Sequence, residues 1–342
     1  MILWLLTLAL AAETWPIRSG DTVESVAATI AEGKDVASIV TTLRTANGLA
    51  PGAQPPVGTL LRLPEPKGMH QAQSAFVLTR RGTVTASGTM PTHPATLFET
   101  LPMGTVVCTG TDSYATLRVS TQCTLTGEHS DDLTLSPETC VQLVSAHGSE
   151  RGRSTVARVL EGSIQVQENP AGKGHVTVQA GTGQTTGAGG GYRVTLEDDA
   201  AMRAEALYAP VAVQGAGAEV DLSAGQGSRV REGEAPSDPI DLLAPGTPTR
   251  PDDGVALRKP WFAWTPVPAA FGYRFEVATG RDFVDLVYSD DLPDPDYQPS
   301  LLMLPWPEDG VLHWRIASFD RFGFLGIPSV PRSMELPTSA GG

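Results

Sequence analysis

Basic side chains are scarce in this sequence. Over 342 residues there are 24 Lys and Arg against 38 Asp and Glu, which gives a formal net charge of −14 at pH 7. Proteins bind nucleic acids and anionic membrane surfaces mainly through clustered Lys and Arg. The composition therefore excludes both as expected partners.

The sequence also lacks the short motifs of common hydrolases and metal sites. There is no Gly-x-Ser-x-Gly, no His-Glu-x-x-His and no Cys-x-x-Cys. His70, His93 and His175 lie near Gly or Pro in surface-like segments. Four acidic pairs lie in polar contexts that predict turns, where neighbouring side chains diverge: Asp131-Asp132, Asp198-Asp199, Asp252-Asp253 and Asp290-Asp291. We expect a protein that is not an enzyme and has no cofactor and no metal site. The alternative is catalysis by residues distant in sequence, such as a wall hydrolase that uses one of the acidic side chains; two carboxyl groups facing one cleft would distinguish it.

Long apolar runs are missing apart from one at the start of the chain. The stretch Ile2–Ala12 is almost wholly apolar, but it is shorter than the roughly 20 residues of a membrane-spanning helix. It is typical of a secretory signal, with Ala9-Leu10-Ala11 as the cleavage site. We therefore expect residues 1–11 to be a signal peptide and the protein to be exported to the periplasm or cell envelope, with no membrane span after cleavage. Because no Lys or Arg precedes the run, a retained anchor or a misassigned start is the alternative.

Cysteine is rare, with three residues at Cys108, Cys123 and Cys140. In an exported protein they allow one disulfide and leave one thiol. The spacing does not tell which two of the three form the bond. A zinc site is the weaker alternative, because the nearest histidines, His129 and His147, lack ligand spacing.

Glycine and proline are abundant, with 36 and 28 residues, while 41% of the chain is apolar and 18% is charged. This composition favours short strands and turns over long helices, and the length predicts two or three domains. We expect a mainly β multidomain fold, with domains at 13–65, 76–234 and 253–338 and linkers at 66–75 and 235–252.

The first domain is predicted to fold in the order strand, helix, helix, strand. Trp15–Arg18 alternates as a strand, and Asp21 with Glu24 has the spacing of a helix N-cap and its partner. Asn47-Gly48 ends the second helix, and residues 57–64 form the last strand. Apolar residues recur at three- and four-residue steps in both helices: Val23, Val26, Ala27 and Ile30, then Val36, Ile39, Val40 and Leu43.

This segment resembles the LysM domain, a small βααβ module that binds polymers of N-acetylglucosamine. The family pattern is an aromatic strand, Gly-Asp-Thr, a Val-Ala or Ile-Ala helix, Leu-x-x-x-Asn-Gly-Leu and Gly-x-x-Leu-x-Ile-Pro. The matching residues are Trp15, Gly20-Asp21-Thr22, Val26-Ala27, Leu43 with Asn47-Gly48-Leu49, and Gly58 to Pro64. The resemblance covers residues 13–65 and implies peptidoglycan or a related glycan as partner.

The resemblance also implies a binding surface on two loops, 19–23 and 47–51. Backbone groups of irregular loops can pair with the acetamido group and ring hydroxyls, while a small apolar side chain such as Leu49 covers the methyl. The implied glycan-binding residues are Ser19, Gly20, Asp21, Thr22, Val23, Asn47, Gly48, Leu49 and Ala50. Each also has a structural alternative, as a cap for Asp21, a turn for Asn47 and core for Trp15. One such module binds weakly, on the order of micromolar to millimolar, so retention at a wall needs other contacts.

The second domain has the period-two alternation of an all-β fold. Predicted strands lie near 83–85, 104–107, 114–119, 132–135, 141–144, 164–166 and 176–178. Residues 200–207 are predicted to be a short helical turn or a loop. The glycine-rich stretch 181–191 precedes a strand and lacks the P-loop Lys, so we expect a flexible hairpin tip rather than a phosphate site.

This domain resembles the FecR-type β domain of bacterial sigma-factor regulators. The counterparts of the family pattern are Leu101, Gly104, Val107 and Thr109; Ala115 and Leu117; Leu133, Leu135 and Pro137; Leu160, Gly162, Ile164 and Val166; and Thr186-Gly187. The resemblance implies an all-β fold that can bind an envelope protein. The regulators' membrane helix and sigma-binding segment have no counterpart, so the sigma-factor role is not carried over.

The third domain is similar to a fibronectin type III or Ig-like sandwich. Its signals are Pro260-Trp-Phe-Ala-Trp264, Tyr273-Arg-Phe275-Glu-Val277, and Trp314-Arg-Ile316 followed by Asp320-Arg-Phe-Gly323. We expect Trp264, Tyr273 and Trp314 in the core. Phe322, Phe324 and Trp306, on predicted loops, are the candidates for an exposed contact patch.

The sequence thus predicts an exported, non-catalytic envelope protein that binds a glycan through its first domain, with two β domains as scaffold or partner-binding surface. The alternative is a signalling or assembly component whose FecR-like domain binds an envelope protein and whose LysM-like segment is degenerate.

Overall fold

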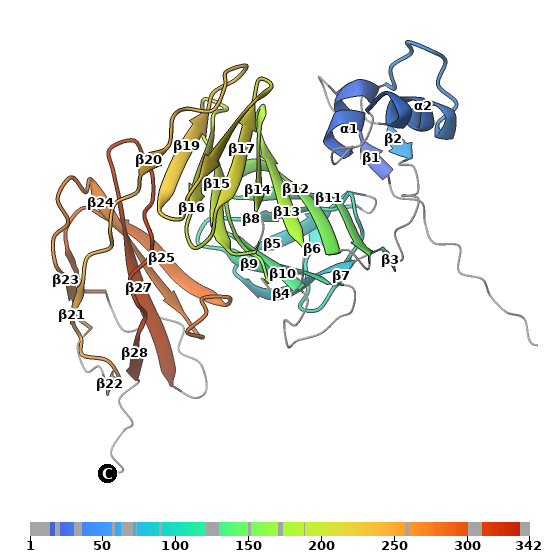
Figure 1. Ribbon diagram of the computed structural model, residues 1–342. Coiled ribbons are helices and arrows are strands. Elements are labelled where there is room, and N and C mark those ends of the chain that lie inside the picture. The colour runs from blue at the N-terminus through green and yellow to red at the C-terminus, as the bar shows by residue number, and fades with distance from the viewer. Residues whose placement is uncertain are drawn as a thin grey trace, which may run out of the picture. The chain divides into compact units, whose positions relative to one another are not determined.

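The structure is a computed structural model that divides the chain into two compact units, Met1–His70 and Gln71–Gly342 (Figure 1). It describes residues 14–17, 21–30, 36–56, 59–62, 71–72, 74–88, 91–120, 130–149, 152–169, 174–187, 189–256, 260–299 and 310–335. The predicted signal peptide 1–11 lies outside these residues, as do Ser19, Gly20, Cys123 and Trp306.

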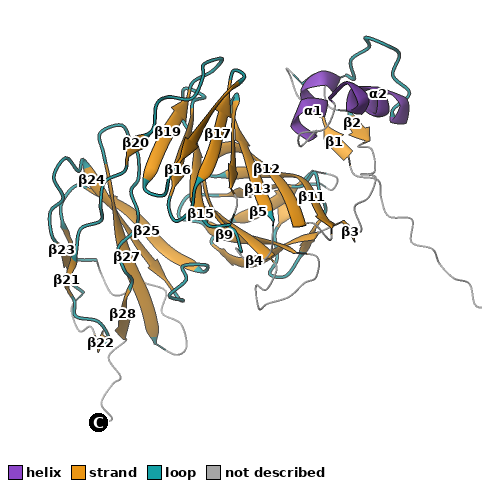
Figure 2. Cartoon of the chain, in the orientation of Figure 1, coloured by secondary structure: helices purple, strands orange, loops and turns teal. Residues whose placement is uncertain are grey.

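The fold is mainly β and multidomain, as the sequence predicts (Figure 2). Two helices occur within the described ranges, and both belong to the first unit. Neither of these helices has the length and apolar character that crossing a membrane requires.

The first unit has the predicted βααβ order. Its elements are β1 (Thr14–Pro16), α1 (Val23–Ile30), α2 (Val36–Ala46) and β2 (Leu60–Arg62), and β1 pairs antiparallel with β2. Its core contains the predicted helix positions Val23, Val26, Ala27 and Leu43, together with Ile17 and Leu61. Val36 departs from the predicted stripe: it is exposed at the first position of α2.

The two helix ends are fixed by short polar motifs. The cap of α1 is Thr22, one residue after the predicted Asp21, because Thr22 Oγ1 accepts the Ser25 amide at 3.0 Å and Ser25 Oγ accepts the Thr22 amide at 2.9 Å. At the end of α2, Gly48 has φ +64° and the Leu49 amide bonds back to Arg44 O at 2.9 Å. This is a Schellman ending, which confirms Asn47-Gly48 as the helix stop.

The central domain, residues 71–241, begins the second unit and is built of strands only. They are β3 (Gln71–Ala72), β4 (Ser74–Arg81), β5 (Val84–Ser87), β6 (His93–Pro94), β7 (Thr100–Leu101), β8 (Val106–Thr109), β9 (Tyr114–Ser120), β10 (Ser130–Leu135), β11 (Cys140–Ser149), β12 (Gly152–Gln167), β13 (His175–Ala180), β14 (Gly183–Gly187), β15 (Gly191–Leu196), β16 (Met202–Ala206), β17 (Val211–Gly215), β18 (Ala218–Leu222), β19 (Gln226–Val230) and β20 (Ile240–Asp241).

These strands form two sheets that share β12 and close on one another. Sheet I runs β20-β19-β16-β15-β12-β10-β9-β4-β7, and sheet II runs β18-β17-β14-β13-β12-β11-β8-β5-β6. Aliphatic side chains from both sheets form one core, which includes Val77, Leu117, Leu133, Val178 and Val213.

Strand β12 passes from one sheet to the other at Gly162. Its first part pairs with β11 and β13 in sheet II, and its last part pairs with β10 and β15 in sheet I. Gly162 has φ +78°, and a Cβ there would lie 2.6 Å from Glu138 O and 2.8 Å from Thr139 Cα. Only glycine fits this crossing.

Two predictions for the central domain are wrong. Residues 200–207, predicted as a helical turn or loop, contain strand β16, which pairs with β15 and β19. Residues 181–191, predicted as a flexible hairpin tip, contain strand β14 and are packed: Gly183 lies against Met202 and Val230, and Gly187 lies against Glu168 and Tyr192. The glycines leave room for these side chains, so their role is close packing.

The C-terminal module, residues 248–335, is the predicted β-sandwich. Its strands are β21 (Pro248–Arg250), β22 (Val255–Ala256), β23 (Phe262–Trp264), β24 (Gly272–Ala278), β25 (Leu286–Leu292), β26 (Asp296–Tyr297), β27 (Val311–Phe319) and β28 (Arg332–Glu335). They form the sheets β21-β23-β26 and β22-β28-β27-β24-β25. The expected core residues Trp264, Tyr273 and Trp314 are buried.

The C-terminal module packs on the outer face of sheet I. At one end Thr116 Oγ1 donates to Val284 O at 2.6 Å, and Arg81 pairs with Asp285 at 3.0 Å. At the other end Phe324, expected to be exposed, is buried at 6% exposure between Arg203 and Arg229, whereas Phe322 is exposed as predicted. Within residues 235–252, expected to be a linker, β20 pairs with β19 and β21 with β23.

Candidate functional site

The candidate site lies on the loops before α1 and after α2 in the first unit. Asp21 and Thr22 are half-buried on the first loop, while Asn47 and Leu49 are half-buried and Gly48 and Ala50 exposed on the second. Ser19 and Gly20 lie outside the described residues. Val23 is the exception among the implied glycan contacts: its side chain is fully buried in the core of the unit. The burial of Val23 agrees with the apolar stripe predicted for α1, and it leaves only the backbone of this residue for the loop surface.

Gln54 joins the two loops. Its Oε1 accepts the backbone N–H of Val23 at 2.8 Å, and its Nε2 donates to Glu24 Oε2 at 2.8 Å. The N–H of Val23 is one of the free amides at the start of a helix, so Gln54 takes a donor that a ligand would otherwise use. Gln54 is 31 residues from Val23 in sequence. Sequence reasoning missed it because it matches no motif position.

Arg44 holds the second loop from the side of α2. Its Nη1 donates to the carbonyls of Ala50 and Ala53 at 2.9 and 2.6 Å, and its Nη2 pairs with Glu24 Oε1 at 2.6 Å. The hydrogen bonds from Gln54 and then Arg44 lower the pKa of Glu24 to about 2. Glu24, Arg44 and Gln54 thus form one polar network that fixes the backbone of residues 50–54 against the start of α1.

Several implied binding residues have structural roles in this arrangement. Thr22 caps α1, and Asn47 Nδ2 donates to Leu43 O at 2.8 Å in the ending of α2. Leu49, Ala50, Pro51 and Gly52 remain half-buried or exposed on the second loop. What the loops offer a ligand is therefore a short surface of backbone groups and small apolar side chains on a fixed frame.

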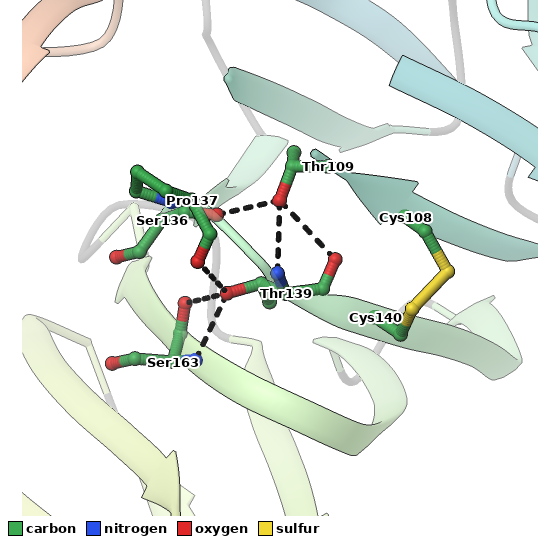
Figure 3. The surroundings of a disulfide bond; sticks show 7 residues. All are labelled: Cys108, Thr109, Ser136, Pro137, Thr139, Cys140 and Ser163. Atoms are coloured by element: carbon green, nitrogen blue, oxygen red, sulfur yellow. Dashed lines mark hydrogen bonds between the residues drawn. A yellow bond between two sulfur atoms is a disulfide. The ribbon is translucent and has the colours of Figure 1, made fainter. Parts of the chain in front are cut away.

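The disulfide joins Cys108 and Cys140, which face each other on neighbouring strands β8 and β11 with 4.1 Å between their Cα atoms (Figure 3). Beside it, Thr109 Oγ1 donates to Ser136 O at 2.6 Å and accepts the Thr139 amide at 3.0 Å. Thr139 Oγ1 in turn accepts the Ser163 amide at 3.0 Å. The bond therefore strengthens the corner where β8, β11 and β12 meet, which is a structural role.

Two of the acidic pairs lie on strands instead of the predicted turns. Asp131 and Asp132 are buried on β10, and Asp132 accepts two hydrogen bonds of 2.7 Å from Arg118. Asp290 and Asp291 lie on β25, where Asp291 accepts two hydrogen bonds of 2.8 Å from Arg274. The sequence suggested turns because adjacent acids are common there, but cross-strand arginines stabilise these carboxylates in the sheet. Among the described residues no group of three or more His, Cys, Asp or Glu is placed to hold a metal ion.

Comparison with known proteins gives no family assignment. No protein-family model matches the sequence, and no curated protein matches it. Two crystal structures of a protein described as an anti-sigma factor from Parabacteroides distasonis are similar to 40% of this chain at 12% identity, with TM-scores of 0.31 and 0.30. This chain covers 59% of the length of those two. The FN1–FN3 domains of chicken CNTN1 are similar to 79% of this chain, over 96% of their own length, at 10% identity and a TM-score of 0.23. At such TM-scores the similarities carry no argument about function.

Proposed function

We propose that this protein is exported to the cell envelope and binds peptidoglycan, or a related polymer of N-acetylglucosamine, through the two loops of its first unit. The observation that carries the proposal is the Glu24–Arg44–Gln54 network, which joins the loop between β1 and α1 to the loop between α2 and β2. Two parts of the LysM-like pattern, Asp21-Thr22 and Asn47-Gly48-Leu49, lie on the same two loops.

A fixed loop pair is suited to binding a glycan weakly but specifically. Because Arg44 and Gln54 already order residues 50–54, a ligand does not bear the entropic cost of ordering them. The exposed backbone around Gly48 and Gly52 can pair with an acetamido group, and Leu49 can cover its methyl. The protein is then a non-catalytic binding protein without cofactor, and the second unit serves as scaffold or partner-binding surface.

The test is sedimentation of the full mature protein with insoluble peptidoglycan and with chitin. Ala50→Arg places a large side chain on the exposed second loop and is expected to weaken binding about tenfold. Thr41→Arg adds the same charge on an exposed position of α2 away from the loops and is the matched control. Equal sedimentation of wild type and Ala50→Arg would overturn the proposal.

A signalling or assembly role is the second candidate, in which the central domain binds an envelope protein. It is favoured by an exposed apolar pair, Leu97 and Phe98, at 52% and 51% exposure on the turn between β6 and β7. The use of the Val23 amide by Gln54 also fits a degenerate glycan module. Capture of one stoichiometric protein from envelope fractions, unaffected by wall digestion and lost in Leu97→Ser/Phe98→Ser, would favour this candidate.

A further inference from the structure

The outer face of sheet II carries a row of polar side chains, three of them glutamines. The row crosses five adjacent strands, one residue on each: Arg158 on β12, Gln179 on β13, Gln184 on β14, Gln214 on β17 and Glu219 on β18. Each member is the direct cross-strand partner of the next. On β11 the register continues to Gln142, which is buried, and within the row Gln179 is itself only 8% exposed, so the accessible members are mainly Arg158, Gln184, Gln214 and Glu219.

A second row lies two residues further along the same strands. It consists of Thr177, Thr186, Ala212 and Asp221, again in direct cross-strand register. Because residues two apart on a strand point to the same face, both rows belong to one surface about 7 Å wide. We call the two rows together the amide strip. Its underside is the aliphatic core, represented by Val178 and Val213, so the strip is firmly supported.

The side chains of the strip are aligned by hydrogen bonds to one another. Arg158 Nε donates to Gln179 Oε1 at 3.2 Å, and Thr177 and Thr186 share a bond of 3.1 Å between their hydroxyls. Gln184 donates to Gln214, which donates to Glu219. These bonds use only part of the capacity of the amides. Among the described residues, Gln179 Nε2 and Gln184 Oε1 have no protein partner, and they supply a donor and an acceptor to the strip.

The spacing and charge of the strip select a class of ligand. Neighbouring strands lie about 4.8 Å apart, so five strands span about 19 Å. A β-1,4-linked sugar chain in its extended form advances by nearly the same distance per sugar, so successive sugars meet successive strands. The middle of the strip is uncharged, with Arg158 at one end and Glu219 at the other, and the protein has a net charge of −14. An uncharged polymer rich in hydroxyl and amide groups matches this surface, and a polyanion does not.

We propose that the amide strip of sheet II is a second glycan-binding surface, which holds an extended, uncharged β-1,4-linked polysaccharide laid across strands β12, β13, β14, β17 and β18. The ligand class is that of the proposed function, but the residues are different and belong to the other unit. Recognition rests on hydrogen bonds, because the two rows contain no aromatic side chain. Such contacts are individually weak, so binding grows with the number of strands that the chain crosses. A second weak surface on the same chain also supplies the avidity that a single small module lacks.

The test uses the full mature protein and the soluble hexamer of β-1,4-linked N-acetylglucosamine, with affinity measured by calorimetry. Four proteins are compared: wild type, Ala50→Arg, Gln184→Ala/Gln214→Ala, and the combination of all three changes. Ala50→Arg weakens binding by the first unit, so the further change that the two glutamine substitutions cause in this background reports the strip. Loss of both glutamines is expected to lower that affinity about tenfold. Binding to the strip should also slow hydrogen exchange in β14 and β17, and the dimer of the same sugar should bind far more weakly than the hexamer.

Gln167→Ala is the matched control, because it truncates an exposed glutamine on the part of β12 that lies in sheet I. If Ala50→Arg changes nothing but the double glutamine variant lowers binding, the strip is supported and the proposed function of the loops fails. If Ala50→Arg removes all binding, the strip is an ordinary solvated sheet face and this proposal is overturned. Absence of binding in all four proteins overturns both proposals.

Discussion

Phe324 of the C-terminal module lies under Arg203 of the central domain, with 5.7 Å between the guanidinium carbon and the ring centroid. Arg229 approaches the same ring at 5.8 Å and donates to the carbonyl of Phe322 at 3.0 Å. Glu197 accepts from both arginines, so the two cations are held together over the ring. The two modules are therefore joined by a buried aromatic ring beneath two paired arginines.

Phe324→Ala is expected to lower the free energy of unfolding of the second unit by about 3 kcal/mol, because a buried ring and its cation–π contacts are lost. Urea denaturation followed by tryptophan fluorescence measures this change, since Trp264 and Trp314 are buried in the C-terminal module. Phe322→Ala is the matched control: its ring is 52% exposed, and we expect a change below about 0.5 kcal/mol. Equal losses for the two variants would contradict the buried position of Phe324.

Gly162→Ala is expected to destabilise the central domain by about 3 kcal/mol, because the new Cβ meets Glu138 O and Thr139 in a backbone with positive φ. Gly217→Ala provides the comparison, since Gly217 also has positive φ (+77°) but has nothing within 4 Å of its Cβ position. Gly217→Ala should lower the free energy of unfolding by only about 1 kcal/mol. Thermal unfolding of the two variants measures the effect of the close backbone approach at Gly162, since only Gly162→Ala should lower the midpoint strongly. Similar midpoints for the two variants would contradict the close approach.

The period-two pattern of the sequence predicted seven strands of the central domain, because an alternating stretch such as Val84–Ser87 buries every second side chain. Residues 202–206 show where this fails. Met202, Arg203, Ala204, Glu205 and Ala206 are residues that favour helices, and the segment is a strand only because β15 and β19 pair with it on both sides. Arg203 is half-buried and Glu205 is fully buried where the C-terminal module packs, so these polar side chains do not face solvent.

The candidate site was predictable only where its residues are consecutive. Gly48 could be placed because a glycine after a helical stripe is a local signal. The bond from Gln54 to Val23 could not be predicted, since 31 residues separate the two and no pattern connects them. The burial of Phe324 was hidden for the same reason: its partners Arg203 and Arg229 belong to another module.

Cys108→Ser/Cys140→Ser removes the disulfide and is expected to lower the free energy of unfolding by about 3 to 4 kcal/mol. The reason is that the bond closes a loop across a sequence separation of 32 in the unfolded chain. Urea denaturation of this variant and of the oxidised wild type measures the change in the free energy of unfolding. Cys123→Ser is the control, since it leaves this bond intact. A wild-type protein that is equally stable with and without reductant would contradict the prediction.

The helices of the first unit should lose stability in acid because of Glu24. Its pKa is lowered to about 2 by Gln54 and Arg44, below the 4.5 expected for the unfolded chain. A carboxyl group with a lowered pKa stabilises the fold fully above the unfolded value, and this contribution is lost as pH falls from 4.5 towards 2. The effect is modest, because the Glu24 side chain is 52% exposed.

Helical circular dichroism measured against pH reports this loss of stability, since the described helices all belong to this unit. Glu24→Gln should lose this pH dependence, whereas Gln54→Ala should move it to higher pH by removing the main cause of the lowered pKa. A Glu24 carboxyl that titrates near 4.5 in the wild type would show that the two loops are not joined as described.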